Sequence, residues 1–221
     1  MPNAQCPIFK ENHKAISHFP NVAYNIVAIA ASRGGLKAIG KILSALPADF
    51  PAAIVVVQHL SSKFPSYMAQ ILANRTSLRV KQAEEGELLR PGTVYTCVPD
   101  KHLIVKPDAT LSFAYGPKVH FVRPAADKLF ISVAASFKSR AIAVVLTGKD
   151  SDGTLGVVAI KKYGGLVIAQ DEVTCECFSM PKSAIDTGKV DWVLPLDAIA
   201  DHLIKEIMTE KVAEQIQTTA C

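Results

Sequence analysis

Three polar residues in this sequence are of the types that nucleophilic acyl transfer uses. Ser32 and His59 each follow an apolar run, and an aspartate lies in the loop after a third run, which ends at Leu146. A serine hydroxyl becomes a nucleophile when a base accepts its proton, and histidine titrates close to neutral pH. A carboxylate beside the imidazole fixes its tautomer and stabilises the imidazolium. Together the three residue types favour a serine hydrolase.

Each of these residues also has a simpler interpretation. Ser32 can be the N-cap of a following helix, and His59 can be a structural or solvated histidine. The aspartate can form a turn, or cap a helix, in a loop that contains glycine. A phosphate cradle at Ser32-Arg33-Gly34-Gly35 is a further alternative. However, the sequence contains neither the complete G-x-G-x-x-G spacing nor a Walker A motif.

The apolar runs before the three residues have the composition of strands that are buried on both faces. They cover residues 26–30, 53–58 and 141–146. Apolar residues at helical spacing follow the first run, over residues 36–46. Alternation of strands and helices predicts an α/β fold with a mostly parallel, doubly wound, Rossmann-like sheet. The carboxyl ends of parallel strands share one edge, so the three polar residues can converge there.

The rest of the chain is expected to form one domain around this sheet. Short strands at close spacing over residues 78–115 predict a β-hairpin insertion. The domain is expected over residues 24–208, with a last helix over 196–208. Residues 1–23 are expected to be an irregular lead-in and residues 209–221 a C-terminal tail.

Composition excludes several classes of protein. The formal net charge is +4 over 221 residues, without a dense Lys/Arg run, which argues against a nucleic-acid interface. The sequence contains no run of about 18 apolar residues, so no membrane span is expected. The first residues lack the pattern of a signal peptide, so a cytoplasmic protein is expected. The five cysteines are scattered and do not form the paired sets of a zinc site, so reduced thiols are expected.

Several blocks of the sequence, in order, resemble the catalytic domain of the chemotaxis receptor methylesterases of the CheB type. The resemblance extends over residues 26–204. Its blocks include AASRGG at 30–35, LPADFP at 46–51, VVQH at 56–59, PGTVY at 91–95, LTG at 146–148, DG at 152–153 and AQDE at 169–172.

The resemblance implies a hydrolase of γ-glutamyl methyl esters on the cytoplasmic helices of methyl-accepting chemoreceptors. Many members of the family also deamidate receptor glutamines. In such an enzyme Ser32 would be the nucleophile, His59 the general base and then acid, and Asp152 the orienting carboxylate. Backbone N–H groups near His59 and Lys149 would form the oxyanion hole. No metal or organic cofactor would be needed.

The sequence departs from the family pattern beside these residues. Arg33 stands where threonine is usual, and Lys149 and Asp150 stand where methionine and glycine are usual. Arg33 and Lys149 would flank the site and steer an acidic receptor surface toward it. A catalytically weak receptor-binding module of the same fold is therefore the alternative function.

Two further expectations follow from the resemblance. Asp150 and Asp152 are two residues apart, so only one of them is expected to point at His59, and Asp152 occupies the family's carboxylate position. Family members often carry an N-terminal receiver domain that gates activity. The lead-in over residues 1–23 is too short for such a domain, so no switching by phosphorylation of a receiver aspartate in this chain is expected.

Overall fold

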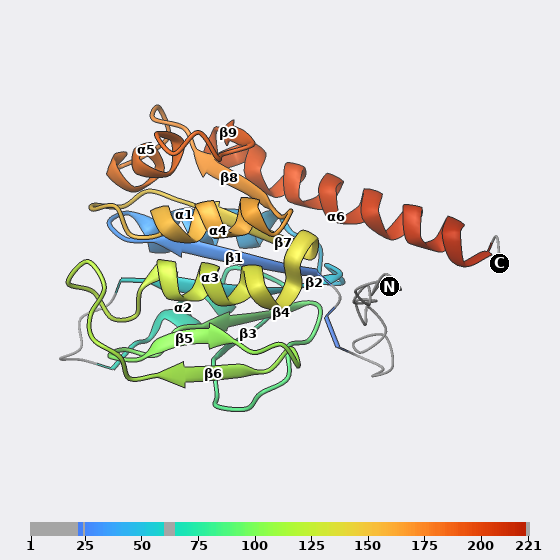
Figure 1. The fold of residues 1–221 in the computed structure, drawn as a ribbon, viewed down its shortest axis with the longest axis horizontal. Helices are drawn as coiled ribbons and strands as arrows, with labels where there is room; N and C mark the ends of the chain where they lie inside the picture. The colour runs from blue at the N-terminus through green and yellow to red at the C-terminus, as the bar shows by residue number, and fades with distance from the viewer. Residues whose placement is uncertain (1–21, 24, 60–64, 220–221) are drawn as a thin grey trace, which may run out of the picture.

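A seven-stranded sheet with the order β3-β4-β2-β1-β7-β8-β9 forms the centre of the molecule (Figure 1). The structure is a computed structural model that describes residues 22–23, 25–59 and 65–219, with side chains as far as residue 208. The strands of this sheet are β1 (Asn25–Ala31), β2 (Ala52–Gln58), β3 (Arg79–Gln82), β4 (Thr93–Thr96), β7 (Ala141–Val145), β8 (Leu166–Gln170) and β9 (Trp192–Leu194). All of its strand pairs are parallel, which confirms the predicted α/β fold.

Helices cover both faces of the sheet. Helices α3 and α4 pack against each other on the face toward the viewer in Figure 1, whereas α1 contacts α2 and α6 on the other face. The helices are α1 (Gly35–Ala45), α2 (Met68–Ala73), α3 (Ala126–Phe137), α4 (Thr154–Lys162), α5 (Ser179–Ile185) and α6 (Leu196–Thr219), with a 3₁₀ turn, η1, at Lys138–Arg140.

The central strands are buried because helices lie on both sides of them. All seven residues of β1 and all seven of β2 are buried, as are the five of β7. Apolar residues on both faces of a strand are what a parallel sheet between two helical layers requires. Strand β1 lies between β2 and β7, with Ala31 opposite Gln58 and Ala30 opposite Val145.

The predicted hairpin insertion over residues 78–115 is shorter than expected. Of the four strands described in this stretch, β5 (His102–Val105) and β6 (Leu111–Ala114) pair in antiparallel fashion, and Leu88 forms an isolated antiparallel bridge with Thr110. Strands β3 and β4 fall in the same stretch of sequence but join the main sheet as parallel strands, with Val80 opposite Val94 and Val94 opposite Ile54. Close spacing along the chain shows that the strands are short, but it does not determine which strand each one pairs with.

The ends of the chain also bear on the predicted boundaries. Helix α6 extends to Thr219, so the predicted helix end at Met208 is wrong, while the boundary at 209 between the domain and a C-terminal tail stays a prediction. Apart from Val22 and Ala23, the predicted lead-in lies outside the described residues.

The arrangement leaves a site at the carboxyl edge of β2, β1 and β7. From β1 the chain continues through α1 to β2 on one side, while β7 pairs on the other side of β1. Such a switch point is where open α/β sheets bind ligands. The turn into α1 depends on Gly34, whose φ is 77°, a conformation that glycine adopts without steric cost.

Candidate functional site

The backbone of Ser32 is fixed at the switch point from both sides. Its N–H donates to the carbonyl of Thr147 at 3.0 Å, and its carbonyl accepts from Gln58 Nε2 at 2.6 Å. Its Cβ packs against Gly148, where an added Cβ would come within 2.9 Å of Ser32 Cβ and 2.2 Å of Met180 Sδ. Gly148 is therefore required for the close approach of the two loops, and Ser32 is held between β1 and β7.

His59 lies beside Ser32 because it is the first residue after β2. Its N–H donates to the carbonyl of Ala31 at 3.1 Å, which continues the pairing of β1 with β2 by one residue. Neighbouring strands are about 4.8 Å apart, so this pairing brings the backbones of His59 and Ser32 together. Only 9% of the His59 side chain is exposed.

Asp152 reaches the imidazole from the loop between β7 and α4. Its Oδ2 lies 2.8 Å from His59 Nε2 and accepts the N–H of Ala126 at 2.6 Å, while Oδ1 accepts the N–H of Asp127 at 3.0 Å. The simpler interpretation of this aspartate as a helix cap therefore also has a basis in the structure, although the helix is α3 and not the following α4. Because three donors hold the carboxylate, it fixes the orientation of the histidine ring.

Asp150 also contacts the histidine, so the expectation that only one of the two aspartates points at His59 is wrong. Its Oδ2 lies 3.3 Å from His59 Nδ1, and its Oδ1 accepts the N–H of Asp152 at 2.8 Å. The φ of Asp150 is 90°, which turns the loop back so that both side chains face the ring. Their spacing in the sequence does not reveal this turn, because positive φ is uncommon for residues other than glycine.

The two carboxylates change the proton affinity of the histidine. Burial alone would lower the pKa of His59, because it disfavours the charged ring. The hydrogen bonds and charges of Asp150 and Asp152 outweigh burial and raise this pKa from 6.5 to about 9. The imidazole is therefore held as an imidazolium at neutral pH, with a carboxylate facing each nitrogen.

Arg33 and Lys149 are exposed beside this cluster. Neither side chain forms an ion pair with any residue that the structure describes, and Arg33 contributes its carbonyl to Thr147 Oγ1 at 3.0 Å. The structure therefore places both cations next to the Ser32 turn and the Asp150 loop without bringing them into the hydrogen-bonded cluster.

The backbone donors differ from the predicted oxyanion hole in one respect. The N–H of His59 is already bonded to Ala31, so His59 itself has no free donor. The N–H groups of Arg33, Gly34 and Lys149 have no acceptor among residues 22–23, 25–59 and 65–219. These three donors, at the loops on either side of Ser32, are therefore free to bind an oxygen atom.

A cavity of about 690 Å³ opens beside Ser32, between α1 and α2. It combines apolar and basic side chains. Its apolar lining includes Leu36, Tyr67, Met68 and Ile71, and its basic lining consists of Lys37 and Arg75.

Sequence reasoning did not identify the residues that support the cluster. Gln58 holds the Ser32 carbonyl, and the first turn of α3 holds Asp152, from a part of the chain far from both loops. Only the register of β1 against β2 and the packing of α3 on α4 reveal these partners. In the part of the chain that the structure describes, no group of three or more His, Cys, Asp and Glu side chains is arranged to hold a metal ion.

Comparison with known proteins gives one consistent result. Residues 27–203 match the family model described as CheB methylesterase. A protein-glutamate methylesterase/protein-glutamine glutaminase of Pyrococcus horikoshii is 44% identical over 194 residues, which is 85% of this chain and 52% of that protein. The protein-glutamate methylesterase FrzG of Myxococcus xanthus is 42% identical over 186 residues, 84% of this chain and 56% of that protein. The chain thus spans about half the length of these relatives.

A solved structure agrees with the sequence matches. The crystal structure of the Thermotoga maritima CheB methylesterase catalytic domain superposes with a TM-score of 0.80 at 43% identity, covering 82% of this chain and 97% of that one. The match therefore covers most of this chain and nearly all of that catalytic domain.

Proposed function

We propose, from the premise that this chain belongs to the CheB methylesterase family, that it hydrolyses γ-glutamyl methyl esters on the helices of chemoreceptors. We extend the proposal to deamidation of receptor glutamines, because a relative carries both activities in its name. The observation that carries the proposal is the 2.8 Å contact of His59 Nε2 with Asp152. This contact lies at the edge of the sheet where β1 ends and Ser32 follows.

In the proposed reaction His59 Nδ1 takes the proton of Ser32 Oγ, because Nε2 faces Asp152. The serine oxygen attacks the ester carbonyl carbon, and the oxyanion that forms collapses as the bond to methanol breaks. The imidazolium gives its proton to the departing methoxide. Water then hydrolyses the acyl-enzyme by the same proton transfers, which restores Ser32 and releases the receptor with a free glutamate side chain.

The free backbone donors support the stabilisation of the oxyanion. The N–H of Lys149 and those of Arg33 and Gly34 face no acceptor among the described residues. Donors that are fixed before the reaction stabilise developing charge without reorganising. A side chain other than methionine at position 149 does not prevent this role, since the donor belongs to the main chain.

The experiment that tests the proposal is methanol release from methylated receptor. Purified protein should release methanol, and a serine-directed phosphonate should label Ser32. The alternative, a catalytically weak receptor-binding module, is favoured by Asp150 facing the nitrogen that would receive the serine proton. That alternative predicts receptor binding with neither labelling nor methanol release.

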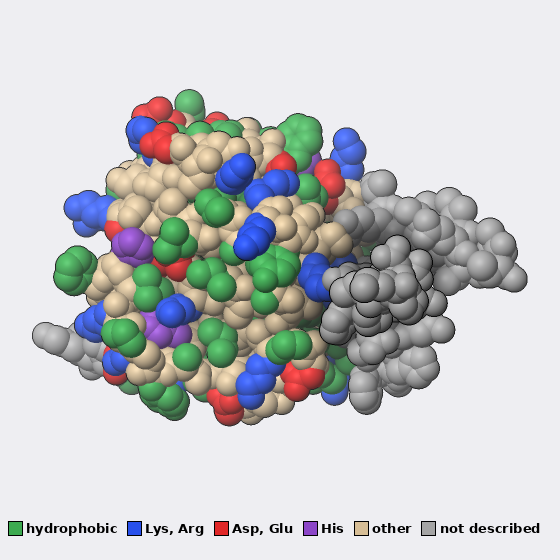
Figure 2. All heavy atoms as spheres, in the orientation of Figure 1, with side chains coloured by type: hydrophobic (Ala, Val, Ile, Leu, Met, Phe, Trp, Pro, Cys, Tyr) green, Lys and Arg blue, Asp and Glu red, His purple; other side chains and the backbone are tan. Residues whose placement is uncertain are grey.

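The cavity beside Ser32 supports a helical, acidic substrate. Its apolar side chains would contact the apolar face of a receptor helix, and Lys37 and Arg75 would face its carboxylates. No helix within the described residues is long and apolar enough to cross a bilayer. The proposed place of the reaction is the cytoplasmic part of the receptor. On the face shown in Figure 2, Lys and Arg side chains are interspersed with acidic and apolar ones, without a continuous basic stripe for nucleic acid.

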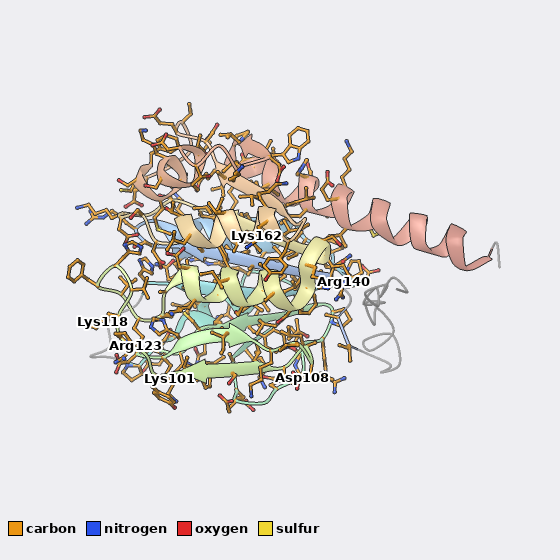
Figure 3. The ribbon with its side chains drawn as sticks, in the orientation of Figure 1. Lys101, Asp108, Lys118, Arg123, Arg140 and Lys162 are labelled. Atoms are coloured by element: carbon orange, nitrogen blue, oxygen red, sulfur yellow. The ribbon has the colours of Figure 1, made fainter. Side chains whose placement is uncertain are left out.

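Steering by charge predicts a dependence on salt. We expect Arg33→Ala, or added salt, to lower kcat/KM on receptor by about three- to tenfold, because fewer cations attract the acidic surface. A small neutral methyl ester should be hydrolysed at an unchanged rate. Lys162→Ala is the control, because Lys162 (labelled in Figure 3) is an exposed cation in the last turn of α4, at the opposite end of this helix from the Asp150 loop. Equal losses on both substrates would contradict steering.

The raised pKa of His59 predicts opposite pH trends for activity and stability. The neutral form of His59 that can act as a base appears only as pH rises, so kcat/KM should increase with pH along a curve whose midpoint is near pH 9. The protonated ring stabilises the folded state, so this contribution is complete below pH 6.5 and is lost as pH rises through about 9. Rate measurements and chemical denaturation between pH 6 and 10 check both trends. A flat rate profile would exclude His59 as the base.

A further inference from the structure

Two carboxylates face the single imidazole at the centre of the site. Asp152 Oδ2 is 2.8 Å from Nε2, and Asp150 Oδ2 is 3.3 Å from Nδ1. An imidazole has only two nitrogens, so none is left for Ser32 in this arrangement. Accordingly, no hydrogen bond joins Ser32 Oγ to His59 among the residues that the structure describes.

Asp150 is held in this place by a hydrogen bond within its own loop. Its Oδ1 accepts the N–H of Asp152 at 2.8 Å, so one oxygen fixes the loop while the other faces the ring. Its φ of 90° is unfavourable for a residue with a Cβ. Only 31% of its side chain is exposed, so solvent screens its charge only partly. The geometry that brings this carboxylate to Nδ1 is therefore built into the loop.

We propose that Asp150 is a positioning residue that restrains the reaction by holding the His59 imidazolium between two carboxylates, so that Nδ1 cannot accept the proton of Ser32. This inference rests on the proposed function, because it concerns the same base. An imidazolium has no lone pair, so it must lose its Nδ1 proton to solvent, and Nδ1 must part from Asp150, before the serine can be activated. The restraint is therefore strongest at neutral pH and weakens as pH rises.

The other groups around His59 do not provide a competing explanation. Arg33, in the turn after β1, is exposed. Cys97, directly after β4, is buried, and burial raises the pKa of its thiol to about 12, so the thiol stays neutral. From α3, Asp127 faces His120 at 3.4 Å. Lys149, next to Asp150, is exposed. The two groups that raise the pKa of His59 to about 9 are Asp150 and Asp152. At that pKa about one ring in a hundred is neutral at pH 7.

The test compares Asp150→Asn and Asp150→Gly with the unmodified protein. Asparagine removes the charge, can still accept the N–H of Asp152, and tolerates positive φ. Glycine removes the side chain and fits the φ of 90°. Asp108→Asn is the control for net charge, because Asp108 lies in the β5–β6 turn, at the end of the hairpin away from the site (Figure 3).

Two measurements are needed on each variant: kcat/KM on a methyl ester from pH 6 to 10, and the titration of His59 by NMR. For both Asp150 variants we expect the midpoint of each curve to fall by about one pH unit, and the rate at pH 7 to rise about tenfold. The rate at high pH should change little. The Asp108 variant should match the unmodified protein.

An unmoved titration of His59, or a rate at pH 7 that stays level or falls while the titration moves, would overturn the role of Asp150. Failure of the proposed function has a different signature, which is the absence of Ser32-dependent methanol release in the unmodified protein and in every variant.

Discussion

Ser32→Ala is expected to abolish methyl ester hydrolysis, with a loss of roughly 10⁴–10⁶ in kcat, as removal of a serine nucleophile does in hydrolases of this type. The fold should be unaffected. Alanine keeps the Cβ that packs on Gly148 and the backbone bonds to Thr147 and Gln58. The hydroxyl oxygen itself has no hydrogen bond to any described residue, so the free energy of unfolding should change by less than about 0.5 kcal/mol. Methanol release and thermal unfolding measure the two effects.

Ser44→Ala is the matched control, because Ser44 is an exposed serine of α1 whose hydroxyl donates to the carbonyl of Lys41 and forms no other hydrogen bond among the described residues. This variant should hydrolyse the ester at the normal rate. Retained turnover in pure Ser32→Ala protein would rule out the serine mechanism, whereas unfolding of that protein would leave phosphonate labelling of Ser32 in the unmodified chain as the deciding measurement.

Asp152→Asn is expected to reduce kcat by roughly 10²–10⁴, because it disturbs the tautomer of the base. The carboxylate serves three donors, from Ala126, Asp127 and His59, but a carboxamide has one acceptor oxygen. If the amide nitrogen replaces Oδ2, it donates to Nε2 and moves the proton of the neutral ring to Nδ1. Nδ1 then has no lone pair for the proton of Ser32.

The same substitution should also reduce stability. With the amide in either orientation, one backbone N–H at the start of α3 loses its acceptor in a buried place, which costs about 1–3 kcal/mol. Rates must therefore be measured well below the melting temperature of the variant.

Asp127→Asn is the matched control for Asp152→Asn. It converts another buried carboxylate of the α3 start, one that accepts the N–H of Gly156 and does not touch His59. Its loss of kcat should stay below about tenfold. Asp150→Asn should likewise not be crippled. If Asp150→Asn were the inactive variant, the orienting carboxylate would be Asp150. If neither Asp150→Asn nor Asp152→Asn reduced the rate, the Ser-His-Asp mechanism would be excluded.

The periodicity and composition of the sequence predict where strands and helices lie better than they predict which strands pair with each other. The buried runs that form β1, β2 and β7 are recognisable because both faces are apolar, and their shared carboxyl edge follows from parallel pairing. Strand β3 is exposed at Arg79 and Gln82 and half-buried between them, as at the edge of a sheet, and this exposure is compatible with either a hairpin or a parallel edge. Its parallel pairing with β4 depends on long-range contacts that no local pattern contains.

The candidate site shows the same limit at the level of single residues. Ser32 and His59 are placed by the strands before them, so their proximity follows from the predicted sheet. Asp150 and Asp152 both face the His59 ring because Asp150 has a positive φ, which aspartate rarely adopts. The hydrogen bonds from the start of α3 to Asp152 depend on tertiary packing. The glycine that is usual in the family at position 150 is a signal of the positive φ, whereas the contact of α3 with Asp152 has no signal in the sequence.

The assembly of the site from β1, β2 and β7 determines when the chain can become active during synthesis. The β5–β6 hairpin and α3 are synthesised after β2 and before β7. Strand β1 can therefore pair with β7, through Ile26 and Ala141, only after this intervening segment has been made. A ribosome-bound chain that ends before Asp152 therefore has a serine and a histidine but lacks their carboxylate. Such long-range pairing is slow to form, so recovery of hydrolysis on refolding should follow the last step of sheet assembly and not the early formation of helices. If the proposed function holds, a growing chain therefore gains its complete Ser-His-Asp set only after β7 and the loop that carries Asp152 have joined β1.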